Sequence, residues 1–237
     1  MKTMKLQRIL GMVMVVALSA GYASCSSEED DTPPPLAAPL DEGTFVDERD
    51  GQTYGWVRYG RLDWMTDNFR YNLNTPHCSI YLDADEYYNN PSSTRNLAKY
   101  GRLYDLQGAL DACPEGWRLP TDEDWQQLEQ LLGMSAADAQ RMGWRGNVGH
   151  SMFSTKDAPC PLNLLLGGYY TQNINMARSE WRFMGVYGYY WTSSLDPEKE
   201  GQYYLCRKFV YNSSEVCRMS IDPIQIQLNV RYVRDVQ

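Results

Sequence analysis

Histidine is nearly absent from this chain of 237 residues: only His77 and His150 occur, and they lie far apart in the sequence. A structural zinc site needs several cysteine or histidine ligands, most of them closely spaced. The six cysteines follow no zinc-binding spacing either. The sequence therefore predicts neither a metal site of this type nor a metal cofactor.

Two motifs that carry enzyme chemistry are also missing. No G-x-S-x-G elbow occurs, and Ser193 and Ser194 stand in an expected strand with no histidine near them in the sequence. No glycine-rich phosphate loop occurs. A pair of carboxylates could still meet in space without leaving a sequence pattern, so an acid–base enzyme stays open as an alternative. The expectation is a protein that is not an enzyme.

Basic residues are outnumbered, with 22 Lys and Arg against 30 Asp and Glu and a formal net charge of −8. Lys2, Lys5 and Arg8 lie in an N-terminal segment without acids, so its removal leaves the chain more acidic still. Nucleic acids and anionic lipid surfaces attract basic patches. The charge balance argues against both as partners.

One apolar run stands out, residues 9–18, and it is shorter than the roughly 20 residues of a membrane-spanning helix. Basic residues before it and small residues after it indicate a secretory signal peptide over residues 1–24. Tyr22-Ala23-Ser24-Cys25 then resembles a bacterial lipobox, in which Cys25 is lipidated and becomes the mature N-terminus. Plain cleavage that leaves Cys25 a free thiol is the alternative. Two or more acyl chains would anchor the protein stably in a membrane.

Residues 25–42 are expected to form a tether. Its acidic run at 28–31 is similar to the surface-export signal of gut-type Gram-negative lipoproteins, and three prolines follow at 33–35. Such proline-rich segments adopt extended, semi-rigid polyproline II. We therefore expect a lipid-anchored protein of the cell outer membrane, exposed at the surface, with one folded domain over residues 43–237.

The clearest local pattern predicts a helix after Thr121. Thr121 can cap its N-terminus, and Asp124 stands where a capping box places an acid. Gly133 is expected to end the helix. Helical periodicity predicts one buried face, formed by Trp125, Leu128, Leu131 and Leu132. The opposite side, which is expected to face solvent, is formed by Gln126, Gln127, Glu129 and Gln130.

Turn residues and alternation predict strands elsewhere. Hairpins are expected over 44–65 and over 203–221, the second with its turn at 212–214. A short helix is expected at 135–142, and further strands at 162–170 and 188–194. Residues 224–232 alternate apolar and polar, which predicts a strand with one buried face and one polar face.

Residues 72–96 are expected to be a polar loop with the acids Asp83, Asp85 and Glu86. Carboxylate oxygens suit Ca²⁺, but the spacing lacks the glycine and the distal glutamate of a dedicated calcium loop. A solvated loop is the favoured interpretation.

Several motifs follow one another along the chain. They are T-F-x-D-x-R-D-G-x-T-Y from Thr44, W-M-x-x-N from Trp64, Y-G-x-L-Y from Tyr100, C-P-x-G-W-x-L-P-T from Cys113, G-Y-Y-W from Gly188 and V-R-Y-V-R-D from Val230. In these motifs the chain resembles the Fibrobacter succinogenes major paralogous domain family. That family usually has Cys where this chain has Tyr232, a departure that would leave a cysteine elsewhere without its partner.

The segment R-L-P-T-x-x-x-W from Arg118 is also similar to the sulfatase-modifying-factor family, whose fold is a variant of the C-type lectin fold. The resemblance implies an α+β, C-type-lectin-like mixed fold with short twisted antiparallel sheets, one or two helices and long loops. It also implies that Trp117 and Trp125 are core residues. The related enzymes need closely spaced thiols near the C-terminus or a multi-histidine motif, and neither occurs here.

Apart from Cys25 the chain has Cys78, Cys113, Cys160, Cys206 and Cys217. In an oxidising compartment most should pair, with one left over. Cys206 and Cys217 flank the predicted turn at 212–214 on adjoining strands. We expect them to form a disulfide if the strand register allows it.

Residues 171–188 lie between two expected core strands. In the lectin-like fold, loops in this part of the chain form the ligand-facing surface. An exposed indole offers a flat apolar face to a sugar ring, while amides and guanidinium groups supply hydrogen bonds. The alternative is that Trp181 and Phe183 lie beneath the loop as a small core. The predicted ligand-binding residues are Asn173, Asn175, Arg178, Trp181, Arg182 and Tyr187.

The main hypothesis is therefore a surface lipoprotein that binds an extracellular glycan or protein. The alternatives are a structural or adhesive subunit of a cell-surface assembly and a divergent sulfatase-modifying-factor-like enzyme. Exposed aromatics beside Asn, Asp or Arg would favour the glycan binder, and a larger apolar patch would favour the structural subunit.

Overall fold

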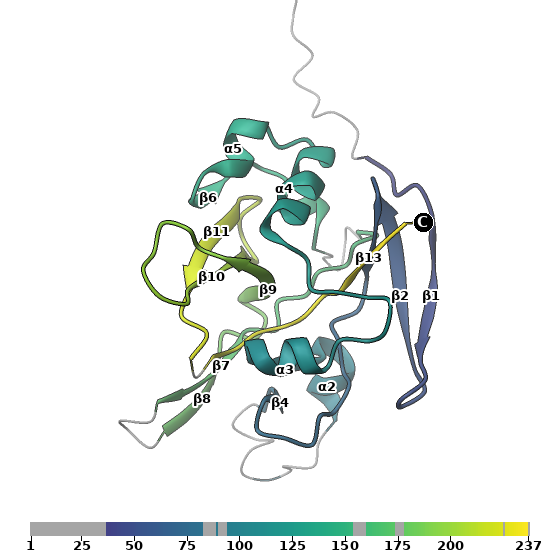
Figure 1. The fold of residues 1–237 in the computed structure, drawn as a ribbon, viewed down its shortest axis with the longest axis vertical. Coiled ribbons are helices and arrows are strands. Elements are labelled where there is room, and N and C mark those ends of the chain that lie inside the picture. Colours follow the sequence, from purple (N-terminus) through teal and green to yellow (C-terminus); the bar gives the residue numbers. More distant parts are fainter. Residues whose placement is uncertain are drawn as a thin grey trace, which may run out of the picture. The chain divides into compact units, whose positions relative to one another are not determined.

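The computed structural model describes residues 37–82, 89, 94–153, 160–173, 178–224 and 226–236. The chain divides into the units Met1–Pro33 and Pro34–Gln237, and all described residues lie in the second. Cys25 and the acids Asp83, Asp85 and Glu86 lie outside the described residues. The described part has an α+β fold with short antiparallel sheets, which confirms the predicted class (Figure 1).

The described residues form four α-helices, more than the one or two expected. None of them is long and apolar enough to cross a membrane. The helices are α2 (Arg95–Tyr100), α3 (Leu106–Asp111), α4 (Asp122–Leu131) and α5 (Ala136–Gln140), and a short 3-10 helix, η1, spans Gly149–Ser151.

Two four-stranded sheets hold most of the strands, and all pairings between named strands are antiparallel. The first sheet has the order β1-β2-β3-β13, from Glu42–Asp47, Gln52–Tyr59, Leu62–Met65 and Val233–Asp235. The second has the order β6-β11-β10-β9, from Gly143–Arg145, Val216–Ile221, Tyr204–Val210 and Tyr187–Leu195. Two small sheets are β12-β7-β8, from Ile226–Gln227, Tyr169–Asn173 and Arg178–Arg182, and β4-β5, from Cys78–Ile80 and Arg102–Tyr104. The two predicted hairpins are confirmed.

The two large sheets bury side chains on both faces. Trp64 of β3 and Tyr190 of β9 belong to one core cluster, while their neighbours Met65 and Trp191 belong to another. Because successive side chains of a strand point to opposite faces, each sheet contributes to both clusters. Trp125 and Trp117 lie in the first and second cluster respectively, as predicted.

Helix α4 begins as the capping pattern predicts. The Thr121 hydroxyl accepts from the N–H of Asp124 at 3.1 Å, and the Asp124 carboxylate accepts from the N–H of Thr121 at 2.7 Å. Two positions differ from the expected faces: Leu131 is 47% exposed, whereas Glu129 is fully buried.

Glu129 is buried because arginines of the second sheet meet it beneath α4. We call Asp122, Glu129, Arg145, Arg207 and Arg218 the ion cluster. Glu129 pairs with Arg145 at 2.6 Å and with Arg207 at 2.7 Å. Asp122 pairs with Arg207 at 2.6 Å and with Arg218 at 2.8 Å. Buried charges destabilise a fold unless they are paired, and each charged group of the ion cluster has at least one partner of opposite charge.

The C-terminal segment, residues 226–235, crosses the domain and is drawn in yellow in Figure 1. It pairs with β7 through β12, with β5 at Leu228, with β9 at Asn229 and with β3 through β13. This single segment therefore joins all four sheets.

The prediction of a one-faced strand over 224–232 is wrong. Gln227, Asn229 and Arg231 are buried, while Ile224 is 68% exposed. The segment has protein on both sides, and the three polar side chains donate to backbone carbonyls of other segments. Alternation in sequence cannot separate a polar face in water from a polar face with buried partners.

The predicted strand at 162–170 forms only from Tyr169 on, as the start of β7. Before that point the segment has only isolated bridges. Its backbone is engaged by side chains instead. Arg231 donates to the carbonyls of Leu162 at 3.1 Å and Asn163 at 2.6 Å, and the Tyr190 hydroxyl donates to the carbonyl of Leu165 at 2.7 Å. These bonds satisfy backbone acceptors that the bonds of a strand ladder would otherwise satisfy.

Asp122→Asn should destabilise the protein and remove one of the groups whose protonation lowers its stability in acid. Burial acts to raise the pKa of Asp122, but hydrogen bonds and charges from Arg218 and Arg207 outweigh it and bring the pKa to about 2. Because the folded-state pKa is depressed, this carboxylate stabilises the fold above its unfolded value near 3.8 and loses that contribution, roughly 2 kcal/mol, as the pH falls towards 2.

The measurement is urea unfolding of wild type and Asp122→Asn at a series of pH values. At neutral pH the variant should lose about 3 kcal/mol, because the buried Arg207 and the half-buried Arg218 lose a charged partner. The difference in unfolding free energy between wild type and Asp122→Asn should narrow below pH 4. The control Glu123→Gln changes an exposed residue in the same helical turn and should have little effect. A gap that does not depend on pH would contradict the assignment.

Candidate ligand-binding site

The predicted ligand surface folds as a β-hairpin of β7 and β8. Tyr169 lies opposite Arg182, and Tyr170 lies opposite Trp181. Asn173 and Arg178 are the last paired positions. Their side chains, and all of Asn175, lie outside the described part of the chain.

Trp181 and Arg182 occupy opposite faces of this hairpin, because neighbours in a strand alternate. Trp181 packs on Tyr170 with ring centroids 5.1 Å apart, while Arg182 pairs with Glu180. The sequence prediction placed the indole and this guanidinium on one surface. The structure does not bring them together.

Trp181 itself is half-buried, and its indole nitrogen is shielded from solvent. The indole is therefore not the open platform that the sequence suggested. Part of the ring remains accessible beside Tyr170, so it can still form one edge of a binding surface.

An aromatic cluster lies where the hairpin meets β9. We call Tyr169, Phe183 and Tyr187 the Phe183 platform. The Phe183 ring lies 5.9 Å from Tyr169 and 5.2 Å from Tyr187 between centroids. Phe183 is 42% exposed, and the two tyrosines are half-buried. Of the predicted site residues, Tyr187 belongs to this platform.

Lys208 of β10 supports the platform. Its ammonium nitrogen lies 4.1 Å from the centroid of the Tyr187 ring and 5.4 Å from that of Tyr189. The negative face of an aromatic ring attracts a cation, so this contact holds Tyr187 in place. Sequence reasoning missed Lys208 because strand pairing, rather than sequence proximity, places it beside these rings.

Phe183 has an unusual backbone conformation, with φ of +65°. This left-handed backbone conformation costs a residue with a Cβ atom roughly 1–2 kcal/mol, whereas glycine adopts it freely. The turn is held by hydrogen bonds from the N–H groups of Tyr187 and Val186 to the Phe183 carbonyl, both at 2.9 Å. Strain of this kind often marks a functional position.

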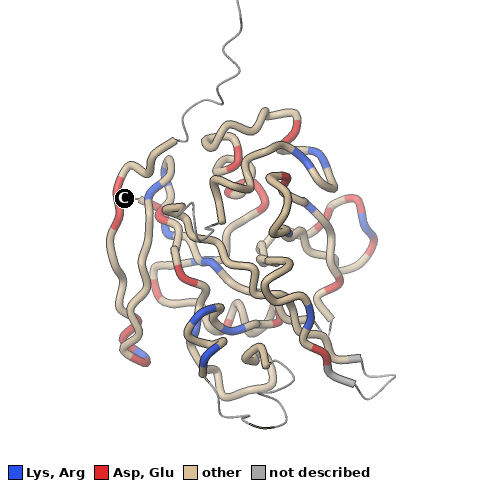
Figure 2. Tube along the Cα trace, turned by 180° about the vertical axis from the view of Figure 1, so that it is seen from behind, with Lys and Arg blue, Asp and Glu red and all other residues tan. Residues whose placement is uncertain are grey.

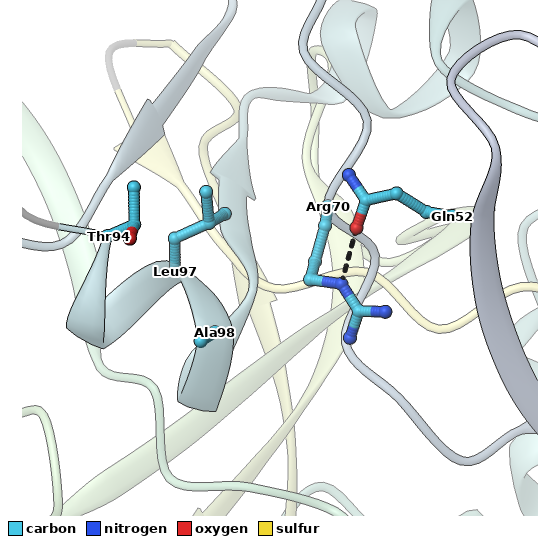
Figure 3. Close-up of a pocket in the computed structure, with 5 residues that line it drawn as sticks. All are labelled: Gln52, Arg70, Thr94, Leu97 and Ala98. Atoms are coloured by element: carbon cyan, nitrogen blue, oxygen red, sulfur yellow. Dashed lines mark hydrogen bonds between the residues drawn. The ribbon is translucent and has the colours of Figure 1, made fainter.

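A cavity of about 410 Å³ lies between β2 and α2 (Figure 3). Figure 3 shows Arg70 and Gln52 on one side and Thr94 and Leu97 of the α2 end on the other. Arg70 donates to the Gln52 side chain at 2.8 Å and to the Thr53 carbonyl at 2.9 Å. Its guanidinium is thus already bound by the protein, which makes this cavity a weaker candidate.

Another cavity, of about 370 Å³, includes His77 and α3. His77 Nδ1 lies 2.8 Å from Asp105 Oδ2, and the other Asp105 oxygen accepts from the N–H of Gly108 at 2.7 Å. A carboxylate on one ring nitrogen orients the imidazole. The rim carries the exposed side chains of Leu110 and Ile224, at 49% and 68%. Sequence spacing gave no sign that His77 and Asp105 meet.

Within the described residues, no group of three or more His, Cys, Asp or Glu is placed to hold a metal ion. The acids Asp83, Asp85 and Glu86, which were considered for Ca²⁺, lie outside that range.

The predicted Cys206–Cys217 disulfide is not formed, and both residues are free thiols. The register pairs Cys206 with Met219 and Cys217 with Lys208, so the two cysteines are diagonal neighbours rather than direct partners. Burial raises the pKa of both thiols, to about 12 for Cys206. Cys78 and Cys113 are free thiols as well, and the buried Cys160 thiol donates to the carbonyl of Ser151.

Residues 57–234 match the model of the Fibrobacter succinogenes major domain. The chain belongs to this family. No curated protein and no solved structure matches it. The further resemblance to the C-type lectin fold therefore stays a prediction.

Three motifs of the Fibrobacter succinogenes major domain meet at one amide. Asn68, from W-M-x-x-N, accepts from Arg231 of V-R-Y-V-R-D at 2.7 Å, and its side-chain oxygen lies 3.1 Å from the Tyr190 hydroxyl of G-Y-Y-W. All three residues are buried. Tyr169 and Phe183 lie outside the motifs, so the motifs build the scaffold and the Phe183 platform is carried on it.

Tyr232 replaces the cysteine that the family usually has at that position. It is buried in the second core cluster, and the half-buried Cys113 packs against that cluster. Burial raises the pKa of the Tyr232 phenol well above its ordinary value, and Cys113 adds to the shift.

Arg231→Met should strongly destabilise the domain, because the asparagine and the backbone carbonyls that Arg231 binds would lose their buried donor. We expect a loss of about 3–5 kcal/mol and a fall in Tm of about 10 °C or more. Thermal unfolding measures the effect. Arg141→Met, whose guanidinium is 62% exposed, serves as the matched control and should change Tm little. An equal, small shift in both variants would show that Arg231 is not a structural centre.

Proposed function

We propose that this protein is a surface lipoprotein whose domain binds an extracellular glycan or protein and catalyses no reaction. The observation that supports binding is the Phe183 platform, an exposed aromatic group beside the Arg182–Glu180 pair. Aromatic faces combined with hydrogen-bonding groups suit a sugar ring or an apolar side chain.

The non-catalytic part of the proposal is supported by what the motif residues do. Asn68, Tyr190 and Arg231 are committed to one another in the core. The His77–Asp105 pair is the arrangement closest to acid–base chemistry, but its cavity has an apolar rim with Leu110 and Ile224. A C-type-lectin-like domain that presents loops to a ligand is compatible with the short sheets and long connections.

We also propose that the mature chain is anchored in the outer membrane through Cys25 and exposed at the cell surface. Cys25→Ala should release soluble protein or stall signal processing, because the acyl chains would have no attachment site. Fractionation into membrane and soluble pools measures this. Cys78→Ala, a change at a half-buried cysteine of the folded domain, is the control. A Cys25→Ala variant that stays with membranes as wild type does would rule out the lipid anchor.

Trp181→Ala tests the hairpin as the ligand face. If Trp181 contributes to binding, the variant should lose ligand or cell binding while Tm stays nearly unchanged. The screen is a glycan array together with a pull-down of extracellular proteins by the soluble domain. A fall in Tm of many degrees would make Trp181 a core residue, because truncation of a packed tryptophan costs about 3–5 kcal/mol.

A structural or adhesive subunit is the second candidate. It is favoured by the exposed Leu110 and Ile224 beside the His77 cavity. Exposed apolar groups of this kind can mark a contact with another subunit. A double variant, Leu110→Ser with Ile224→Ser, would reduce assembly in that case and leave glycan binding unchanged.

A further inference from the structure

The Phe183 platform has the shape of an aromatic corner. The Phe183 and Tyr187 rings are inclined at 80°, and the Phe183 and Tyr169 rings at 52°. An edge contact with Tyr187 and a tilted contact with Tyr169 therefore brace the phenylalanine. With 42% of its surface exposed, Phe183 keeps area for a ligand that the tyrosines do not cover.

The backbone fixes this ring in place. Phe183 adopts a positive φ, and the turn after it is tied to a neighbouring segment by the Gly185 N–H, which donates to the Leu166 carbonyl at 2.7 Å. A side chain at position 168 would collide with the backbone at Arg182 and Met184, so glycine is required there for the turn to pack. A ring held in this way loses little freedom when it binds a ligand.

The charged groups around the corner are engaged within the protein: Arg182 pairs with Glu180, and the Lys208 ammonium lies over the Tyr187 ring. Arg182, next to Phe183 in the chain, is about half exposed and pairs with Glu180, so the pair is close to neutral. Figure 2 shows basic and acidic residues interspersed along the described trace. The whole chain is acidic, with a formal net charge of −8. A strongly anionic polymer would be repelled, whereas a neutral ligand with hydroxyl groups would not.

We infer, on the basis of the binding function proposed above, that the Phe183 platform is the stacking site for a neutral hexopyranose unit of a glycan. The C–H face of the sugar lies on Phe183, with Tyr187 at its edge. Arg182 and Glu180 form hydrogen bonds with the hydroxyl groups. The apolar corner and the neutral ion pair together match a ring that is apolar on its faces and polar around its rim.

The test uses the soluble domain and an array of neutral oligosaccharides of glucose, galactose and mannose, with heparin as the anionic comparison. Phe183→Leu keeps the apolar volume and removes the flat ring, and Phe183→Gly also removes the backbone strain. Both should lower affinity for the neutral glycan at least about tenfold. Tm should stay within a few degrees of wild type in both. Leu131→Ala, at a similarly exposed apolar residue on α4, should bind as wild type does.

The outcomes separate this inference from the wider proposal. Neutral-glycan binding that survives both Phe183 variants would overturn the platform but keep the glycan-binding function. If the domain binds only heparin, or only a protein, the inference of a neutral sugar ligand is wrong, while the proposed binding function stands. Should Phe183→Leu unfold the domain, Phe183 is core and the inference is wrong. No binding to any glycan or extracellular protein would overturn both.

Discussion

Arg231 holds together segments that are far apart in the chain. Its guanidinium is 1% exposed and donates to the Asn68 side chain and to the carbonyls of Met65, Leu162 and Asn163. Burial lowers the pKa of this group, and the surrounding oxygens compensate the charge as dipoles rather than as a carboxylate. Because the C-terminal segment that carries Arg231 also joins all four sheets, much of the domain depends on these bonds.

The same arrangement explains what the family motifs encode. Asn68, Tyr190 and Arg231 come from three motifs and meet in the core, where the other two both contact the side-chain oxygen of Asn68. Function is better sought on segments that the scaffold displays and that packing does not dictate. The hairpin of β7 and β8 and the strained turn at Phe183 are such segments, and they combine exposed aromatic area with a defined backbone.

Charge is used inside this domain as well as on its surface. The ion cluster connects α4 to the second sheet through two carboxylates and three guanidinium groups. A purely apolar contact of the same size could be as stable. The ion pairs do, however, constrain which residues of the helix and sheet can lie opposite each other, because a shifted register would leave a buried charge without its partner.

The sequence by itself determined the features that depend on residues close together in the chain. These are the capping box of α4, the two hairpins, the buried Trp117 and Trp125 and the membership of the family, because turn chemistry, capping and motif identity are local. For the candidate site it pointed to the segment that contains β8 and Tyr187. Only the tertiary structure decided that Glu129 and Arg231 are buried, that Cys206 and Cys217 are diagonal, and that Trp181 and Arg182 lie on opposite faces. Each of these depends on strand register or on a partner supplied by a distant segment, which hydrophobic periodicity does not record.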